Sequence, residues 1–142
     1  MLRFFAYGLL GWCAEVVWTA LLEFLRTRDL RLAGTSYLWM FPIYGSIAFL
    51  YEPLHDAVRG APIGLRALVW AVGFTAVEWA SGWAIGRVTG RCPWDYVAAG
   101  ARFAIDPYVR WDYFPLWAAV GLALEPVHDF LVRVTPAIAA AL

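Results

Sequence analysis

Four apolar segments, each about as long as a bilayer-spanning helix, make up most of this chain. A transmembrane helix needs roughly 20 mostly apolar residues, and the segments that qualify are 4–25, 37–56, 67–86 and 113–133. Of the 142 residues, 63% are hydrophobic and only 15% are charged. A soluble domain this short needs a more polar surface to stay dispersed. The sequence therefore predicts an all-α, polytopic membrane protein with four transmembrane helices.

The second and fourth segments carry the same residues in the same register. Residues 41–56 begin Phe-Pro-Ile-Tyr and end Glu-Pro-Leu-His-Asp. Residues 114–129 begin Phe-Pro-Leu-Trp and end Glu-Pro-Val-His-Asp, with the same distance between the two ends. Because two widely spaced clusters rarely recur in one register by chance, we interpret this as an internal duplication.

The first and third segments echo each other more faintly, since Arg3 precedes Glu15 by the interval that separates Arg66 from Glu78. The duplicated unit is therefore span, loop, span, with repeat one at residues 2–59 and repeat two at residues 65–133, to within a few residues. An even number of spans returns the chain to the same side, so the repeats have the same orientation, related by an axis along the membrane normal. We expect residues 1–142 to form a single transmembrane domain.

The charges exclude some functions and suggest an orientation. The eleven basic residues are all arginine and the net charge is zero, so there is no basic footprint for nucleic acid. No nucleotide-binding sequence, nucleophile triad or Cys/His zinc pattern is present. Seven arginines lie in the first and third connections and four on the other face. The positive-inside rule then puts these loops in the cytoplasm and both termini on the non-cytoplasmic side.

Each segment has one glutamate well inside its apolar run. These residues are Glu15, Glu52, Glu78 and Glu125. Because an acidic side chain at the centre of a membrane helix costs about 2.5 to 3.5 kcal/mol, four of them must face inward. The first hypothesis is a transporter-like or binding role in which they line an intramembrane polar cavity for a cation, a proton or a lipid headgroup. Four spans enclose little volume, so we expect a homo-oligomer in the lipid bilayer.

The third connection, residues 87–112, is long and aromatic. Its Trp94, Asp95 and Tyr96 join the glutamates as predicted ligand-binding residues, because a loop of this kind can lie at the interface or fold over the bundle. Asp95 can instead cap the segment that follows it. Cys13 and Cys92 are expected at different depths, and no disulfide is implied.

A second hypothesis is a carboxylate-bridged dimetal enzyme acting on a lipid or apolar substrate. The order of one glutamate and then Glu-x-x-His, repeated once, is the ligand order of di-iron carboxylate bundles, and such ligands suit iron, manganese or zinc. The predicted metal ligands are Glu15, Glu52, His55, Glu78, Glu125 and His128. Alternatively, the histidines are polar helix ends, each held by the aspartate that follows it. A third hypothesis is a structural or assembly subunit, in which the carboxylates form only interhelical hydrogen bonds.

Motifs spread over nearly the whole chain point to a known family. They are Gly11-Trp12-Cys13-Ala14-Glu15, Trp39, Pro42-Ile43-Tyr44-Gly45, Glu52-Pro53, Glu78-Trp79-x-Ser81-Gly82, Cys92-Pro93-Trp94-Asp95-Tyr96, Trp117 and Glu125. With these residues the chain resembles the putative type IV ABC transporters (CmpB-like), which have small vertebrate transmembrane relatives. The resemblance implies a multi-span membrane protein, although this chain carries no nucleotide-binding domain. It also implies a site centred on the glutamates, which the family pattern keeps better than the histidines.

Overall fold

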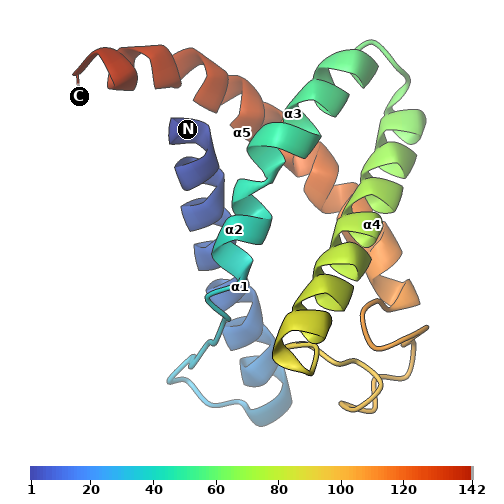
Figure 1. The fold of residues 1–142 in the computed structure, drawn as a ribbon. Coiled ribbons are helices and arrows are strands. Elements are labelled where there is room, and N and C mark those ends of the chain that lie inside the picture. Colours follow the sequence, from blue (N-terminus) through green and yellow to red (C-terminus); the bar gives the residue numbers. More distant parts are fainter. Residues whose placement is uncertain (142) are drawn as a thin grey trace. The chain divides into compact units, whose positions relative to one another are not determined.

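The computed structural model describes residues 1–141, and its regular structure there is helical, with one isolated β-bridge between Ala104 and Arg110. The elements, labelled in Figure 1, are α1 (Leu2–Thr27), α2 (Met40–Gly45), α3 (Ile47–Val58), α4 (Ile63–Thr89), the 3-10 turn η1 (Trp111–Tyr113) and α5 (Phe114–Ala141). The predicted all-α class is confirmed. The helices belong to two compact units: the first is Met1–Leu54 with the described residues from Leu131 onward, and the second is His55–Phe130.

In the first unit, α2 runs alongside α1 because small residues let the two backbones approach (Figure 1). A Cβ placed on Gly11 would lie 2.3 Å from Cγ of Tyr44, and one on Gly45 would lie 2.6 Å from the ring of Phe4. Glycine at such contacts is typical of helices packed within membranes. The close approach brings Tyr44 against the middle of α1, where Glu15 lies.

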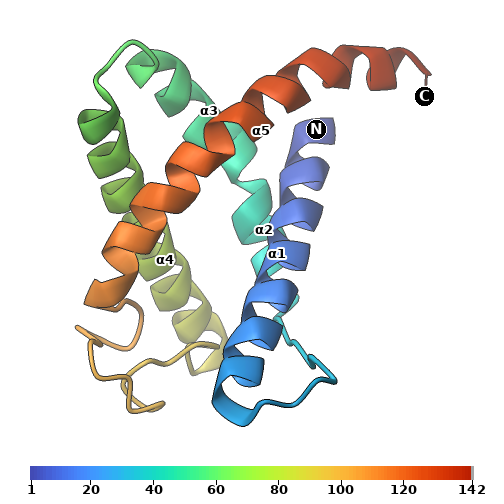
Figure 2. The same cartoon turned by 180° about the vertical axis from the view of Figure 1, so that it is seen from behind.

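In the second unit, close packing occurs between α4 and the first half of α5. A Cβ on Gly121 of α5 would lie 2.2 Å from Cβ of Trp70, which is only 2% exposed. The connection between α4 and α5 folds at the C-terminal end of α4 (Figure 2). There Tyr108 and Trp94 pack against Gly82, at 3.1 and 3.2 Å from its ideal Cβ position. The third connection is thus packed against α4 rather than being a solvated linker.

Within the described residues, two helices, α1 and α4, are long and apolar enough to cross a bilayer. Only 17% and 11% of their apolar windows are buried. A core helix of a soluble protein would be mostly buried, so these largely exposed apolar surfaces fit contact with lipid. The structure therefore supports a membrane protein, with these two helices as its clearest spans.

The predicted segment boundaries need three corrections. The second segment, 37–56, is not one helix: α2 ends at Gly45 and α3 begins at Ile47. At Ser46 the hydroxyl donates to the carbonyl of Ile43 at 2.6 Å, and such local bonding competes with the regular ladder. Helix α4 begins at Ile63, directly after Pro62 and before the predicted residue 67. Helix α5 continues beyond residue 133, through Pro136, to Ala141.

The contact between Gly121 and Trp70 gives a stability test. We expect Gly121→Val to lower the free energy of unfolding by about 1–3 kcal/mol, because the added side chain overlaps the base of a buried indole. Thermal unfolding of the purified protein in mild detergent measures the effect. Gly73→Val is the matched control on α4, since nothing lies within 4 Å of its ideal Cβ. Equal unfolding temperatures for the two variants would contradict the packing described.

Candidate functional site

The four glutamates have two kinds of partner. Two of them, Glu52 and Glu125, pair with arginines, and the other two, Glu15 and Glu78, meet neutral donors. One glutamate of each kind lies in each compact unit. The predicted site residues are therefore not equivalent in their electrostatics.

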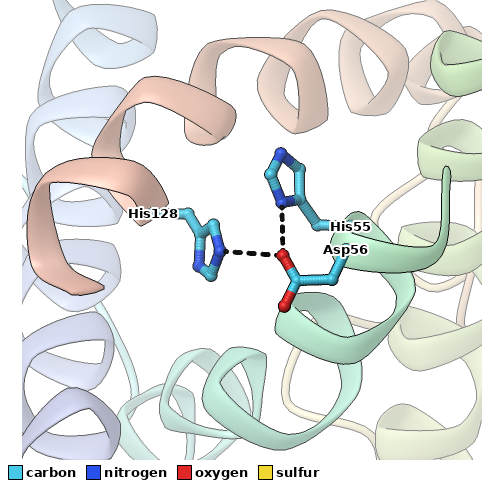
Figure 3. A group of neighbouring side chains, drawn as sticks. All are labelled: His55, Asp56 and His128. Carbon is cyan, nitrogen blue, oxygen red and sulfur yellow. Dashed lines mark ion pairs between the residues drawn. The ribbon is translucent and has the colours of Figure 1, made fainter. Parts of the chain in front are cut away.

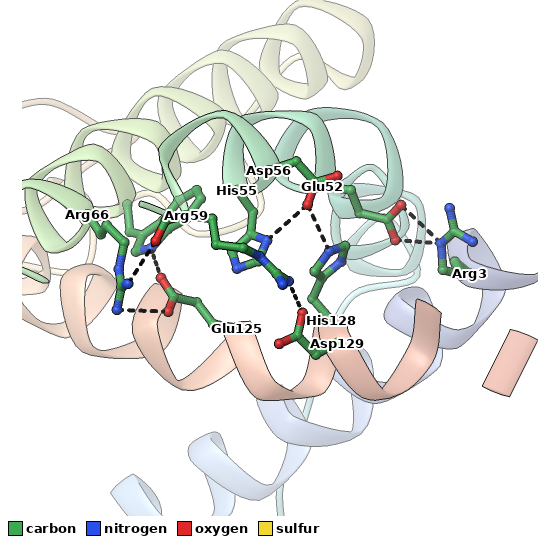
Figure 4. A network of polar contacts seen from close by, with 10 residues as sticks. Arg3, Glu52, His55, Asp56, Arg59, Arg66, Glu125, His128 and Asp129 are labelled. Carbon is green, nitrogen blue, oxygen red and sulfur yellow. Dashed lines mark hydrogen bonds and ion pairs between the residues drawn. The ribbon is translucent and has the colours of Figure 1, made fainter. Parts of the chain in front are cut away.

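In the first unit, Glu52 on α3 receives a guanidinium from the start of α1. Nε of Arg3 donates to both carboxylate oxygens, at 2.7 Å and 3.0 Å (Figure 4). Glu52 is only 7% exposed, so the arginine neutralises a charge that has little access to solvent. Breaking such a pair leaves an uncompensated buried charge, which is strongly destabilising.

In the second unit, Glu125 on α5 is held in the same manner. Nη2 of Arg66 lies 3.2 Å from Oε2 of Glu125, and the indole Nε1 of Trp70 donates to Oε1 at 3.0 Å (Figure 4). The side chains of Arg66 and Glu125 are 23% and 15% exposed. Both carboxylate oxygens are thus occupied by donors from α4.

Glu15, in the middle of α1, has a less complete set of partners. Tyr44 and Ser36 lie within hydrogen-bonding reach of its carboxylate. Its Oε2 atom is buried and has no hydrogen-bond partner among the described residues. An uncompensated oxygen of this kind is unfavourable unless a proton, a cation or a donor from outside the chain occupies it.

Glu78, on α4, is held by two neutral aromatic donors. The Tyr96 hydroxyl donates to Oε1 at 2.7 Å, and the indole Nε1 of Trp117 donates to Oε2 at 3.0 Å. Burial and the adjacent Glu78 carboxylate raise the pKa of Tyr96, so its hydroxyl keeps the proton that it donates. Arg110 also acts on Glu78 electrostatically, but its guanidinium donates to Asp112 at 2.7 and 2.6 Å.

The third connection places the hydroxyl of Tyr96 next to the carboxylate of Glu78. Asp106 organises this loop: its Oδ1 accepts from the backbone N–H of Tyr108 and Val109, and its Oδ2 accepts from the Trp79 indole at 2.8 Å. The backbone N–H of Tyr96 in turn donates to Pro107 O at 3.0 Å. The loop is therefore fixed to α4 and carries its tyrosine into contact with the glutamate.

Of the three loop residues predicted to bind ligand, Tyr96 is the one in contact with a glutamate. The indole of Trp94 donates to Tyr108 O at 3.1 Å, so it holds the loop. Asp95 accepts from the backbone N–H of Ala98 at 2.9 Å and caps a turn. Cys13 and Cys92 are free thiols, and burial raises the pKa of Cys92.

The two histidines lie together, but with an aspartate rather than with the glutamates. The rings of His55 and His128 have centroids 4.6 Å apart, and both face Asp56 (Figure 3). Asp129, which follows His128, forms an ion pair with Arg59. Glu52 and Glu125, two of the six predicted dimetal ligands, are each paired with an arginine. The six-ligand dimetal site stays a prediction.

Sequence reasoning missed three residues that complete these sites, namely Arg3, Arg66 and Trp70. It gave Asp56 as a partner of His55 but not of His128. A signal existed for the arginines, because Arg3 and Arg66 stand at matching intervals before Glu15 and Glu78. No spacing rule indicates that Asp56 serves both histidines, since this needs α3 and α5 to meet at one level.

Comparison with known protein families gives an informative match. A family described as putative ABC-transporter type IV matches residues 2–140, which is nearly the whole chain. No solved structure matches the chain significantly.

The Tyr96–Glu78 contact gives a second test. Tyr96→Phe removes only the hydroxyl and leaves one oxygen of a part-buried carboxylate without its donor. We expect the free energy of unfolding to fall by about 1–3 kcal/mol, measured by thermal unfolding in detergent. Tyr37→Phe is the control, because Tyr37 is 49% exposed. If both variants unfold like the wild type, this hydrogen bond does not hold the loop.

Proposed function

The chain belongs to the family of putative type IV ABC transporters, and from that premise we propose that it is a small transport or binding protein of the membrane. Its ligand is a positively charged species, namely a proton, a cation or the ammonium group of a lipid headgroup. The residues that bind it are Glu15 and Glu78. The observation that carries the proposal is Glu78, a carboxylate on an apolar helix whose two hydrogen bonds come from neutral aromatic donors.

We infer a division of roles among the four glutamates. An arginine supplies a full positive charge to Glu52 and to Glu125, which makes these two pairs structural. The donors to Glu15 and Glu78 bring no net charge, so the negative charge of each carboxylate remains in an apolar setting, where it is costly. Binding a proton or a cation removes that cost, and releasing it restores the charge. Such a pair of states is what a transport site needs.

We also infer four membrane spans built from two tandem repeats. Matching contacts within the two units support the duplication. At matching positions, Arg3 pairs with Glu52 and Arg66 pairs with Glu125. Likewise, Glu15 meets Tyr44 and Glu78 meets Trp117. In this proposal α2 with α3, and α5, supply the second span of each repeat, and their polar residues are neutralised by the contacts described.

The orientation and assembly follow from the same reasoning. The first and third connections carry seven of the eleven arginines, so we place them in the cytoplasm and the termini on the opposite side. A four-span chain encloses little volume. We therefore propose that copies of the chain associate in the bilayer to complete a pathway for the ligand.

A flux measurement in liposomes tests the proposed function. Purified protein is reconstituted, a potassium diffusion potential is imposed, and proton and sodium entry are followed with internal dyes. We expect flux of at least one of these ions, and about a tenfold or larger loss in Glu78→Gln, since a single buried charge contributes several kcal/mol. Glu23→Gln is the matched control, because Glu23 lies on α1 in an exposed pair with Arg26.

A lipid ligand is distinguished in the same samples. If the ligand is a lipid headgroup, native mass spectrometry of the purified protein finds bound phosphatidylethanolamine or phosphatidylcholine. The bound lipid is reduced in Glu78→Gln but retained in Glu23→Gln. If the wild type conducts neither ion and holds neither lipid, the proposal is wrong. It is equally wrong if Glu78→Gln behaves like Glu23→Gln in both measurements.

A further inference from the structure

A cluster outside the glutamate sites brings together three metal-ligating side chains. His55 and Asp56 come from the last turn of α3, and His128 comes from the middle of α5. One ligand atom from each lies within 4.8 Å of the other two. Figure 3 shows both imidazoles turned toward one oxygen of the aspartate. All three residues belong to the second unit.

Two of the three distances between ligand atoms are close to the spacing of ligands around a small tetrahedral ion. Nδ1 of His55 lies 3.4 Å from Oδ1 of Asp56, and Nε2 of His128 lies 3.6 Å from the same oxygen. Zinc bonds to imidazole nitrogen and carboxylate oxygen are 2.0 to 2.2 Å long, so two ligands of a tetrahedral site are about 3.3 to 3.5 Å apart. The three ligand atoms lie within 4.8 Å of one another, so binding an ion brings the side chains closer together.

The surroundings hold the two imidazoles and leave the aspartate accessible. His55 and His128 are 2% and 3% exposed, whereas the Asp56 side chain is 68% exposed. The His55 ring stacks on Trp70, with ring centroids 6.2 Å apart, and Trp70 is anchored by Glu125. The nitrogens are therefore positioned by packing, and an ion can enter past the carboxylate.

Asp56 supplies the negative charge of the cluster, and the charges of Arg59 and Asp129 beside it are paired with each other. Arg59, one turn after His55, is engaged with Asp129, so the carboxylate beside His128 is already neutralised (Figure 4). Asp56 directs its carboxylate at the imidazoles instead. The two Glu-Pro-x-His-Asp motifs therefore contribute both histidines but a single aspartate to the cluster.

We propose that His55, Asp56 and His128 form a mononuclear site for a divalent transition metal, of which Zn²⁺ fits best. Two imidazoles and one carboxylate are ligands that suit zinc and disfavour Mg²⁺ and Ca²⁺. Three protein ligands leave a fourth position for water or a substrate atom. This site differs from the six-ligand dimetal arrangement because its carboxylate is Asp56, while Glu125 pairs with Arg66.

Metal titration of the whole protein tests this site. Protein in mild detergent is freed of metal with a chelator, which is then removed, and Zn²⁺ is titrated by calorimetry, with elemental analysis of the saturated sample. We expect one zinc per chain. His128→Gln and Asp56→Asn are each expected to weaken binding by about 100-fold. Asp29→Asn, an exposed aspartate paired with Arg31, is the control and keeps wild-type affinity.

A second measurement separates this site from the other possibilities. Tetrahedral Co²⁺ has intense visible absorption bands, so cobalt in the wild type reports the geometry directly, and the bands should be absent in His128→Gln. Glu78→Gln keeps full metal binding, which makes failure of this site distinguishable from failure of the glutamate proposal. The proposal is overturned if the wild type binds no zinc. It is also overturned if Asp56→Asn binds normally, or if two metals bind per chain and are lost on changing Glu78.

Discussion

A carboxylate carried on an apolar helix must be neutralised or hydrogen-bonded, because hydrocarbon does neither. Each of the four glutamates well inside the apolar segments has a partner from another segment of its own unit, although Oε2 of Glu15 has none among the described residues. Glu52 and Glu125 draw arginines from the starts of α1 and α4. Glu78 accepts hydrogen bonds from Tyr96 of the third connection and from Trp117 of α5. The polar contacts therefore determine which segments lie next to one another, while small residues such as Gly11 and Gly121 let them approach.

The kind of partner separates structure from function. A guanidinium gives a carboxylate a permanent counter-charge, so the pair gains little by exchanging it for a mobile ion. A phenol or an indole orients the carboxylate but leaves its charge in place. This difference is why Glu15 and Glu78 are the proposed transport residues and why Glu52 and Glu125 are assigned to holding the helices. The histidine cluster is a third type of site, in which two imidazole nitrogens and one carboxylate oxygen are the proposed ligands of a metal ion.

Much of this organisation can be predicted from the sequence. The apolar segments predict helices, and the recurring Glu-Pro-x-His-Asp motifs locate Glu52 and Glu125. Hydropathy does not predict the interruption at Ser46, since it takes no account of a hydroxyl that donates to a nearby backbone carbonyl, here that of Ile43. The partners of the charged groups also escaped prediction, because they depend on contacts between distant segments. Tyr96 was singled out with its neighbours Trp94 and Asp95, but only the loop geometry set by Asp106 shows which of the three reaches Glu78.

The claim that the glutamates fall into two electrostatic classes can be tested most directly by infrared spectroscopy of the protein in bilayers free of small cations. A protonated carboxyl group has a carbonyl stretch that an ionised carboxylate paired with arginine lacks. Our account predicts that such a band grows as the pH is lowered, and that it is reduced in Glu15→Gln and in Glu78→Gln and unchanged in Glu52→Gln. A band that is absent from the wild type, or that disappears on changing Glu52 instead, would contradict it.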